Sequence, residues 1–184
     1  MKRFDPAKSA LLDDPARFAY LSLETVFALL DAPRGATVVD YGAGTGAFAI
    51  PLAHARRDLR VVAYDVEPRM LALARAKPEA AGLGNLVLTG ALDGDLRANV
   101  SRVLGVNVLH ELDDRDLERI AALLDNGGLF VSIDWNASAE RPAGPPPEKV
   151  YSIDEARTFL ERAGLRVAAH TSLTYHEALV AEHV

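Results

Sequence analysis

The sequence predicts an α/β fold, a doubly wound, mostly parallel sheet of seven strands with helices packed on both faces. Three observations favour this class. Short apolar, β-branched runs alternate with helical segments of about 10–15 residues over the first two-thirds of the chain. A glycine-rich loop joins the first run to the helix after it. Only Thr174-Tyr175 separates the last two runs, so one of these strands must run antiparallel, and we expect it at an edge of the sheet.

The N-terminal half is predicted to hold one helix, followed by three strands with two helices between them. Asp14-Pro15 supplies a cap and a first-turn proline for the first helix, which apolar residues at helical spacing extend to Leu30. Short apolar runs predict strands at residues 36–40, 60–64 and 86–89. The segments that join these strands predict helices at residues 46–56 and 68–77.

The C-terminal half continues the alternation. Strands are predicted at residues 102–109, 129–134, 165–173 and 176–183. Asp113 or Asp114 caps the helix between the first two of these strands, and Asn126-Gly127-Gly128 ends it. Ser152 and Glu155 form a capping box for the last helix, after which a glycine in the left-handed conformation is expected.

One biased segment, residues 142–147, contains three consecutive prolines, which fit neither a helix interior nor a central strand. We interpret it as a loop within one domain, because the 37 residues after it are too few for an independent domain. The expected organisation is a single domain over residues 1–184. Residues 1–35 would form an N-terminal helical cap and residues 36–184 the core.

The composition is that of a globular domain and excludes several function classes. With no cysteine, disulfide frameworks, Cys-based metal sites and thiol catalysis are excluded. Twenty Lys and Arg against 26 Asp and Glu give a net charge of −6 without a basic run, so neither nucleic acid nor a membrane surface is an expected partner. The start of the chain lacks the apolar stretch of a signal peptide. We expect a soluble, cytoplasmic protein, monomeric or homodimeric, that acts on a small molecule.

The strongest chemical signal is the stretch Asp40-Tyr41-Gly42-Ala43-Gly44-Thr45-Gly46, between a predicted strand and a predicted helix. Glycines there let the backbone turn tightly and approach a ligand that meets N–H groups at the helix start. Asp65, 19 residues beyond Gly46, ends the second strand, where its carboxylate can accept both hydroxyl protons of a ribose. An adenosine-containing ligand is therefore predicted. The pattern G-x-G-x-x-A, which ends at Ala47, leaves a nicotinamide cofactor as an alternative.

Asp40 favours one of these ligands. It lies two residues before the first glycine, on the ligand side of the strand end, where its charge would repel a pyrophosphate and favour a ligand with an ammonium and a sulfonium. From about residue 36 to its end, the chain resembles the class I S-adenosylmethionine-dependent methyltransferases. Their acidic residue followed by G-x-G-x-G is matched at residues 40–46, their acid after the second strand at Asp65, and their Gly-Gly before the fifth strand at Gly127-Gly128.

Within that superfamily the chain is most similar to small, stand-alone members of the type 11 group. The shorter matches follow the same order along both chains and lie at residues 4–6, 12–15, 106–111, 134–135, 144–146 and 175–176. The resemblance implies a Rossmann-like methyltransferase fold with strand order 3-2-1-4-5-7-6, in which the last strand is antiparallel.

The resemblance also implies roles for the positions that match. Those that would hold the methionine part of the cofactor S-adenosylmethionine are Asp40, Tyr41, Gly42, Ala43, Gly44 and Gly46. Asp65 would bind the ribose. The residues that would flank the adenine are Val66 and Met70 on one side and Gly90, Ala91 and Leu92 on the other, whereas Asn107 and Val108 would lie near the methionine end. The chain departs from the family at Gly90-Ala91, which supply no side-chain acceptor for the adenine amino group, and in a shortened link at residues 93–100.

Two residues at the ends of later strands are candidates for catalysis. Methyl transfer is an in-line displacement, so alignment supplies much of the rate, and a base is needed only where the acceptor must lose a proton. His110 follows the fourth strand and Asp134 ends the fifth, both at the functional edge of such a sheet, although His110 equally fits a structural role there. Trp135, the only tryptophan, fits the core as well as a wall of the acceptor site. His110-Glu111 lacks the second histidine of a zinc motif, so no metal is expected.

The sequence thus predicts an S-adenosylmethionine-dependent methyltransferase with a small-molecule acceptor. One alternative is an NAD(P)-dependent oxidoreductase, which Asp40, Gly127-Gly128 and the lack of a Tyr-x-x-x-Lys pair disfavour. Another is a non-catalytic module that binds S-adenosylmethionine. In the family that the chain resembles, the N-terminal helix and the proline loop usually cover the site, so we expect the same here.

Overall fold

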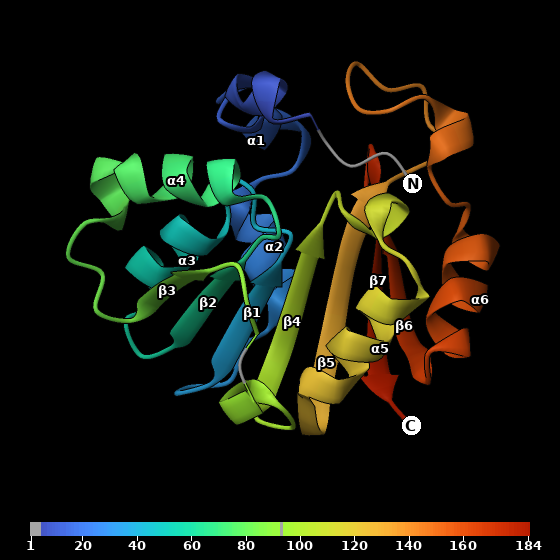
Figure 1. The fold of residues 1–184 in the computed structure, drawn as a ribbon. Helices are drawn as coiled ribbons and strands as arrows, with labels where there is room; N and C mark the ends of the chain where they lie inside the picture. The colour runs from blue at the N-terminus through green and yellow to red at the C-terminus, as the bar shows by residue number, and fades with distance from the viewer. Residues whose placement is uncertain (1–4, 93) are drawn as a thin grey trace.

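The structure, a computed structural model, describes residues 5–92 and 94–184 of the chain. The strands are β1 (Thr37–Tyr41), β2 (Arg60–Tyr64), β3 (Leu86–Thr89), β4 (Val100–Val106), β5 (Leu124–Trp135), β6 (Leu165–Ser172) and β7 (His176–His183). The α-helices are α1 (Arg17–Tyr20), α2 (Leu23–Leu30), α3 (Ala49–Ala55), α4 (Pro68–Ala76), α5 (Asp114–Leu123) and α6 (Ile153–Arg162). The 3-10 helices are η1 (Pro6–Leu12), η2 (Pro78–Ala80), η3 (Gly94–Leu96), η4 (Leu109–Glu111) and η5 (Pro147–Lys149). Strands and helices alternate along the core, as predicted (Figure 1).

The sheet has the strand order 3-2-1-4-5-7-6 that the resemblance implies. β1 to β5 pair in parallel, whereas β7 is antiparallel to both β5 and β6. The expectation of an antiparallel strand at an edge is therefore wrong, because β7 lies inside the sheet and β6 forms the edge. The crossover through α6 carries the chain one position past β5, and the turn at residues 173–175 then brings β7 into the space between them.

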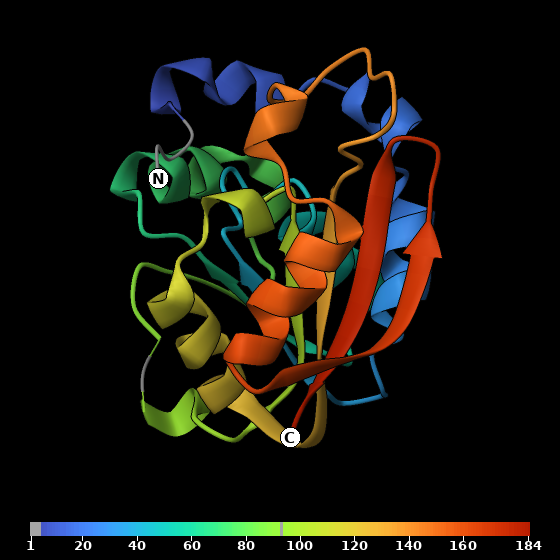
Figure 2. The same ribbon diagram turned by 90° about the vertical axis from the view of Figure 1, so that its right-hand side faces the viewer.

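The apolar core lies on both faces of the sheet, because successive side chains of a strand point to opposite faces. In β1, Val39 belongs to the cluster that contains the apolar residues of α5 and α6, and Val38 belongs to the cluster of α2 and α3. Both valines are fully buried. Figure 2 shows α6 and α2 on opposite sides of the sheet. The doubly wound architecture thus fixes β1 rigidly and, with it, the glycine loop that follows.

The predicted helix from Asp14 to Leu30 is wrong in its continuity, because the chain forms two helices there, α1 and α2. Leu21 between them is extended, and the Oγ of Ser22 accepts a hydrogen bond from the N–H of Thr25 at 3.1 Å as the cap of α2. Serine side chains compete in this way with the helical backbone for its N–H groups. The break separates α1 from α2 and leaves α1 above the sheet in Figure 1.

The fourth and fifth strands differ from their predicted bounds. β4 ends at Val106 because Asn107 has a φ of 55° and leaves the extended conformation. β5 begins at Leu124, so the predicted helix-ending glycines lie within the strand, where Gly127 has a φ of 93°. The register between β4 and β5 shifts between Val100 and Arg102. Such a bulge absorbs the extra residues without disturbing the rest of the ladder.

Two segments outside the sheet lie over the carboxyl ends of its strands. They are the N-terminal segment with η1 and α1, and the loop at residues 136–149 that follows β5 (Figure 1). Neither in these segments nor elsewhere in the described ranges is a helix long and apolar enough to cross a bilayer.

Candidate functional site

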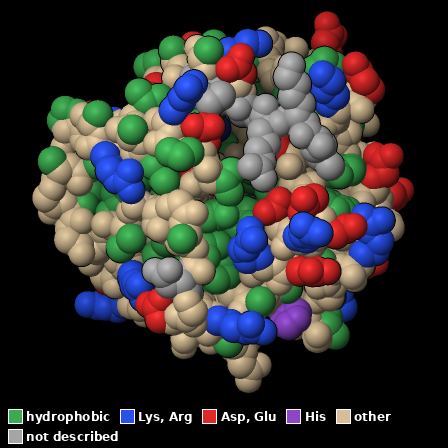
Figure 3. Space-filling model, in the orientation of Figure 1, with side chains coloured by type: hydrophobic (Ala, Val, Ile, Leu, Met, Phe, Trp, Pro, Cys, Tyr) green, Lys and Arg blue, Asp and Glu red, His purple; other side chains and the backbone are tan. Residues whose placement is uncertain are grey.

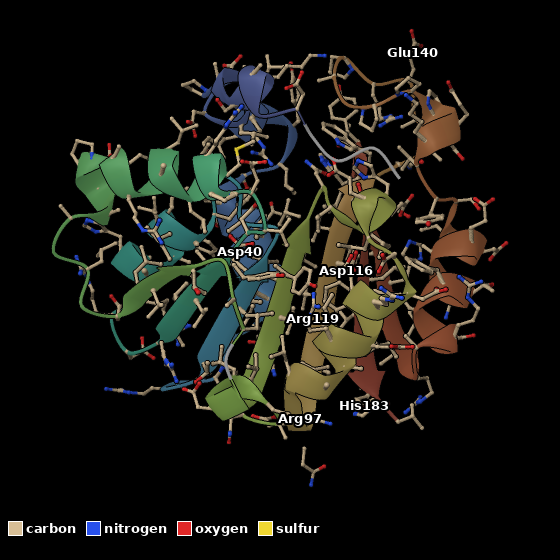
Figure 4. The ribbon with its side chains drawn as sticks, in the orientation of Figure 1. Asp40, Arg97, Asp116, Arg119, Glu140 and His183 are labelled. Carbon is tan, nitrogen blue, oxygen red and sulfur yellow. The ribbon has the colours of Figure 1, made fainter. Side chains whose placement is uncertain are left out.

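A cavity of about 1100 Å³ lies at the carboxyl ends of the parallel strands, the edge where doubly wound sheets bind ligands. Its walls come from the glycine loop, the strand ends, the N-terminal segment and the loop at residues 136–149. Asp40, labelled in Figure 4, lies near the upper end of β1 in that view. The predicted site residues that line the cavity are Asp40, Tyr41, Gly42, Ala43, Gly44, Asp65, Val66, Met70, Asn107, Val108 and His110.

Five predicted site residues are not among the described walls of the cavity, namely Gly46, Gly90, Ala91, Leu92 and Asp134. A Cβ at Gly46 would lie 2.8 Å from the Cδ1 of Ile50, so this glycine lets the loop pack on α3. The N–H of Ala91 donates to the Oγ1 of Thr89 in a tight turn, and Leu92 packs against the apolar core. Asp93, which begins the shortened link, lies outside the described residues, as does Phe4 of the opening motif.

The glycine loop brings backbone within reach of a ligand. Gly42 and Gly44 have φ values of 76° and 55°, which favour glycine. A Cβ at Gly42 would lie 2.6 Å from the Cγ2 of Val108, and one at Gly44 would lie 3.1 Å from the Cδ1 of Leu12. Any side chain here would fill the cavity wall or displace its neighbours, so the loop forms a cradle only because it has no Cβ atoms at these positions.

The carboxylate of Asp65 lies beside the glycine loop and is held there by two backbone hydrogen bonds. Its Oδ2 accepts the N–H of Gly44 at 2.7 Å, and its Oδ1 accepts the N–H of Glu67 at 2.8 Å. Both carboxylate oxygens are thus engaged with backbone N–H groups. The carboxylate is thereby held at the cavity wall in a fixed orientation.

Asp40 is only 2% exposed, and its Oδ2 has no hydrogen-bond partner among the described residues. Burial raises the pKa of Asp40 to about 7, against the lowering effect of Arg17 and with a further increase from Asp65. Arg17 of α1 also lines the cavity, and its guanidinium lies 5.0 Å from the ring centroid of Phe48. A buried carboxyl with one unpartnered oxygen beside a cavity is a polar group prepared for a ligand.

The N-terminal segment contributes contacts that sequence reasoning did not find. The Oδ1 of Asp13 accepts hydrogen bonds from the Oγ1 of Thr45 and the Nζ of Lys77, both at 2.6 Å. Together with Leu12 on Gly44, these bonds attach the segment to the glycine loop and α4. They place Arg17 and Tyr20 in the cavity wall. The Leu12-Asp13-Asp14-Pro15 motif marks this segment in the sequence, but it gives no indication of which residues the segment meets.

His110 and Asp134 form a hydrogen-bonded pair. The Nδ1 of His110 lies 2.9 Å from both carboxylate oxygens of Asp134, whose Oδ2 also accepts the N–H of His110 at 3.0 Å. Burial lowers the pKa of His110, but the hydrogen bond to Asp134 and the charges of Asp134 and Glu111 outweigh it, so the net pKa is raised. His110 lines the cavity and Asp134 lies behind it. The pair can therefore present an oriented imidazole to a molecule in the cavity.

Trp135, the last residue of β5, packs closely against two side chains and a glycine. His176 stacks on one face at a centroid distance of 4.2 Å, and the guanidinium of Arg141 lies 5.5 Å from the ring centroid. Gly144 also packs on the indole, because a Cβ there would lie 2.8 Å from Cε2. Although Trp135 lines the cavity, it is only 8% exposed. It holds the loop at residues 136–149 in place rather than offering an open ring face.

Replacing Gly144 by alanine is expected to displace this loop from the indole. The new Cβ would overlap the ring at a φ of 96°, which disfavours every other residue. Because Trp135 is the only tryptophan, we expect its fluorescence emission to shift to longer wavelength and its quenching by acrylamide to increase. Gly84→Ala, where no atom lies within 4 Å of the added Cβ, is the matched control. Identical spectra for the two variants would show that Gly144 does not hold the loop.

The histidines and carboxylates are the residues of this chain that could ligate a metal ion. In residues 5–92 and 94–184, no three or more His, Asp or Glu side chains are grouped so that they could hold a metal ion. His54, His170 and His183 are exposed, and His176 is buried against Trp135. Burial lowers the pKa of His176 to about 4, so this imidazole is neutral near pH 7.

Known proteins resemble this chain in sequence and in fold. A family model described as a methyltransferase domain matches residues 38–128. The chain is 34% identical over 139 residues to a ubiquinone biosynthesis O-methyltransferase of Methylocella silvestris, covering 67% of this chain and 53% of the relative. The chain therefore spans about half the length of that curated relative.

Solved structures extend the similarity over the whole chain. The crystal structure of an S-adenosylmethionine-dependent methyltransferase from Aquifex aeolicus matches with a TM-score of 0.90 and 31% identity, over 99% of this chain and all of the other. A TehB-like methyltransferase structure from Corynebacterium glutamicum matches with a TM-score of 0.69 and 19% identity, over 98% of this chain and all of the other, and shows the fold alone. Since the first of these structures combines more than 30% identity with full coverage, the chain belongs to the S-adenosylmethionine-dependent methyltransferases.

Proposed function

We propose that this protein transfers the methyl group of S-adenosylmethionine to a hydroxyl group of a small, largely apolar acceptor, with His110 as the base. The observation that carries the proposal is the His110–Asp134 pair at 2.9 Å, which presents an oriented imidazole to the cavity that the glycine loop borders. An alcohol or phenol must lose its proton during methylation, so such a pair has a task with an acceptor of this type. The name of the Methylocella silvestris relative, an O-methyltransferase, supports the same choice.

The residues of the cavity fit S-adenosylmethionine. The left-handed glycines leave room for close approach to the backbone, and the carboxylate of Asp65 is oriented to accept the ribose hydroxyls. The buried, unpartnered Oδ2 of Asp40 would accept from the ammonium of the methionine part, beside Asn107 and Val108. Val66, which is 40% exposed, and Met70 would cover one side of the adenine. We retain Gly90, Ala91 and Leu92 as a proposal for the other side, although they are not among the described walls.

When bound, S-adenosylmethionine supplies an electrophilic methyl group on a sulfonium. The chain's own residues then have two tasks. The glycine loop, Asp40 and Asp65 orient the donor, and alignment of this kind accounts for much of the rate of an in-line displacement. His110 takes the proton of the acceptor hydroxyl at Nε2, while Asp134 accepts from Nδ1–H and stabilises the imidazolium that forms.

Two observations support a small acceptor: the residues of the cavity walls and the distribution of charge on the protein surface. The walls expose more apolar than polar surface, and near the two covering segments they include Tyr20, Pro145, Pro146, Val150 and Tyr151. Figure 3 shows acidic and basic side chains interspersed on the right of that face, without the basic stripe of a nucleic-acid binder. We further propose that residues 1–35 act as a cap on the core in one domain, since Asp13 and Leu12 attach this segment to the glycine loop.

The experiment that tests this function is calorimetric titration of S-adenosylhomocysteine and of NADH into the protein, followed by a panel of phenols, alcohols and amines with S-adenosylmethionine. Micromolar binding of S-adenosylhomocysteine together with methylation of a hydroxyl compound is expected. Binding of NADH alone would instead support an oxidoreductase. Binding of S-adenosylhomocysteine without turnover across the panel would support a non-catalytic module.

Donor affinity is expected to depend on pH through Asp40. With a pKa of about 7, Asp40 is largely protonated below neutrality, whereas the ammonium of the ligand favours its ionised form. Affinity for S-adenosylhomocysteine should therefore fall below about pH 7, by up to roughly tenfold per pH unit, and binding there should release a proton. Calorimetry at about pH 6 and pH 8 measures both. Asp40→Asn should bind more weakly at pH 8 and lose this pH dependence; an unchanged pH dependence would assign it to another group.

A further inference from the structure

His110 lies between two carboxylates, one at each ring nitrogen. Asp134 accepts from Nδ1 at 2.9 Å, and the Oε1 of Glu111 lies 3.8 Å from Nε2. Both side chains of the first pair are about 10% exposed, and that of Glu111 is 20% exposed. The second contact is a charge interaction rather than a hydrogen bond, because it exceeds hydrogen-bonding distance.

The two carboxylates differ in their access to the cavity. Glu111 lines it, whereas Asp134 is not among its described walls and accepts the N–H groups of His110 and Trp135. This difference arises from the backbone, because Asn107 turns the chain out of β4 at a φ of 55° into η4, which carries His110 and Glu111 side by side. Nε2 is therefore the nitrogen on the acceptor side, and Glu111 borders the space in front of it.

We infer that Glu111 is a positioning residue for the base: it lies beside the acceptor-side nitrogen of His110 and holds the imidazolium that forms when the acceptor hydroxyl loses its proton. This inference rests on the proposed O-methylation and adds a second carboxylate to the pair. Asp134 fixes the orientation of the ring through Nδ1, and Glu111 stabilises the positive charge that appears when Nε2 takes up the proton.

The proton and electron balance of the step requires no further reagent. The acceptor oxygen forms a bond to the methyl carbon with a lone pair, and its O–H proton moves to Nε2. The methyl–sulfur bond breaks, and its electron pair remains on sulfur, which becomes a neutral thioether. Two carboxylates then face one imidazolium, Asp134 at Nδ1 and Glu111 near Nε2.

Among the described residues, three charged side chains act on His110. Asp134 of β5 and Glu111 of η4 raise its pKa, whereas Arg141 of the covering loop lowers it. Burial also lowers the pKa and is the largest single influence. Removing the charge of Glu111 should therefore lower the pKa of His110, while the orientation that Asp134 imposes stays intact.

The test is an NMR titration of the five histidines in the ligand-free protein, with His110→Gln to assign the signal of His110. We expect the His110 midpoint to move to lower pH in E111Q and to remain near the wild-type value in E111D. E148Q is the matched control, because Glu148 lines the same cavity without a contact to His110 among those described. D134N should lower the midpoint as well and change the tautomer of the neutral ring, which Asp134 otherwise fixes with the proton on Nδ1.

Two outcomes would overturn the inference. A His110 midpoint in E111Q equal to that in E148Q, while D134N lowers it, would show that Glu111 does not act on the ring. A His110 that does not titrate in the wild-type protein would show that the imidazolium is not accessible. Failure of the proposed function is distinguishable, because it appears as no binding of S-adenosylhomocysteine to the wild type or as no methylation of a hydroxyl compound, whatever the histidine signals do. Unchanged signals of the other four histidines show that each variant is folded.

Discussion

His110→Gln is expected to lower the rate of methyl transfer to a hydroxyl acceptor by about 10²- to 10⁴-fold, the usual contribution of a positioned base. Glutamine keeps the polarity and approximate size of the side chain but cannot take up a proton. Affinity for S-adenosylhomocysteine should change by less than about threefold, because His110 is not part of the glycine loop or the Asp65 contact. Single-turnover kinetics, together with calorimetry, separates these two quantities.

The pH dependence gives the same prediction a second readout. Since Asp134 and Glu111 outweigh burial and raise the pKa of His110, the wild-type rate should rise with pH through that pKa, as the imidazole loses its proton and becomes a base. In His110→Gln this rise should be absent. His183→Gln is the matched control, because His183 is exposed at the opposite end of the sheet (Figure 4). A rate for His110→Gln close to that of this control would contradict a base at residue 110.

The elements that the sequence predicts well are those whose signals are local. The capping box of Ser152 and Glu155 and the cap at Asp113 are both present in the structure, since each depends on residues three apart. β2 and β3 have the predicted bounds, because each is a short, largely apolar run that the sequence shows directly. The strand order came from the resemblance rather than from these signals.

The errors in the fold prediction occur where conformation is decided by a single backbone angle or by contacts far along the chain. Ser22 breaks the N-terminal helix within a continuous apolar pattern, so periodicity alone joins α1 to α2. Asn107 ends β4 through a positive φ that the apolar residues after it conceal. The antiparallel strand was expected at an edge because a turn of two or three residues fixes the relative direction of two strands but not which of them meets β5.

In the site too, the residues that the sequence predicts well are those with local signals. The glycine loop, Asp65 and the His110–Asp134 pair lie directly at strand ends, where topology alone brings them to one edge of the sheet. Arg17, Asp13 and Leu12 were missed as contacts because they reach the glycine loop across more than 20 residues of chain, through bonds such as that from Thr45 to Asp13. Glu111 was considered only for its place beside His110 after the fourth strand, with no contact assigned to it. Its distance to Nε2 depends on the 3-10 turn of η4, which apolar periodicity does not reveal.

Asp65→Ala is expected to weaken the binding of S-adenosylhomocysteine by about 10- to 100-fold, the effect of losing hydrogen bonds to a charged acceptor. Part of this loss would come from the ribose hydroxyls and part from the loop, because Asp65 also accepts the N–H groups of Gly44 and Glu67. Asp95→Asn, at an exposed residue paired with Arg60, should bind as the wild type does.

A ligand without the two ribose hydroxyls separates these contributions. The 2′,3′-dideoxy analogue of S-adenosylhomocysteine should bind the wild type more weakly than the parent compound, because the carboxylate of Asp65 then has no ribose donors to accept from. In Asp65→Ala, the two ligands should bind almost equally. The ratio of the two affinities in the wild type, divided by the same ratio in Asp65→Ala, measures the coupling between Asp65 and the ribose. Any effect of the substitution on the glycine loop acts on both ligands and cancels from this quotient. An equal ratio in both proteins would mean that Asp65 acts only by holding the glycine loop closed, and the ribose would then have to be bound by another residue of the cavity wall.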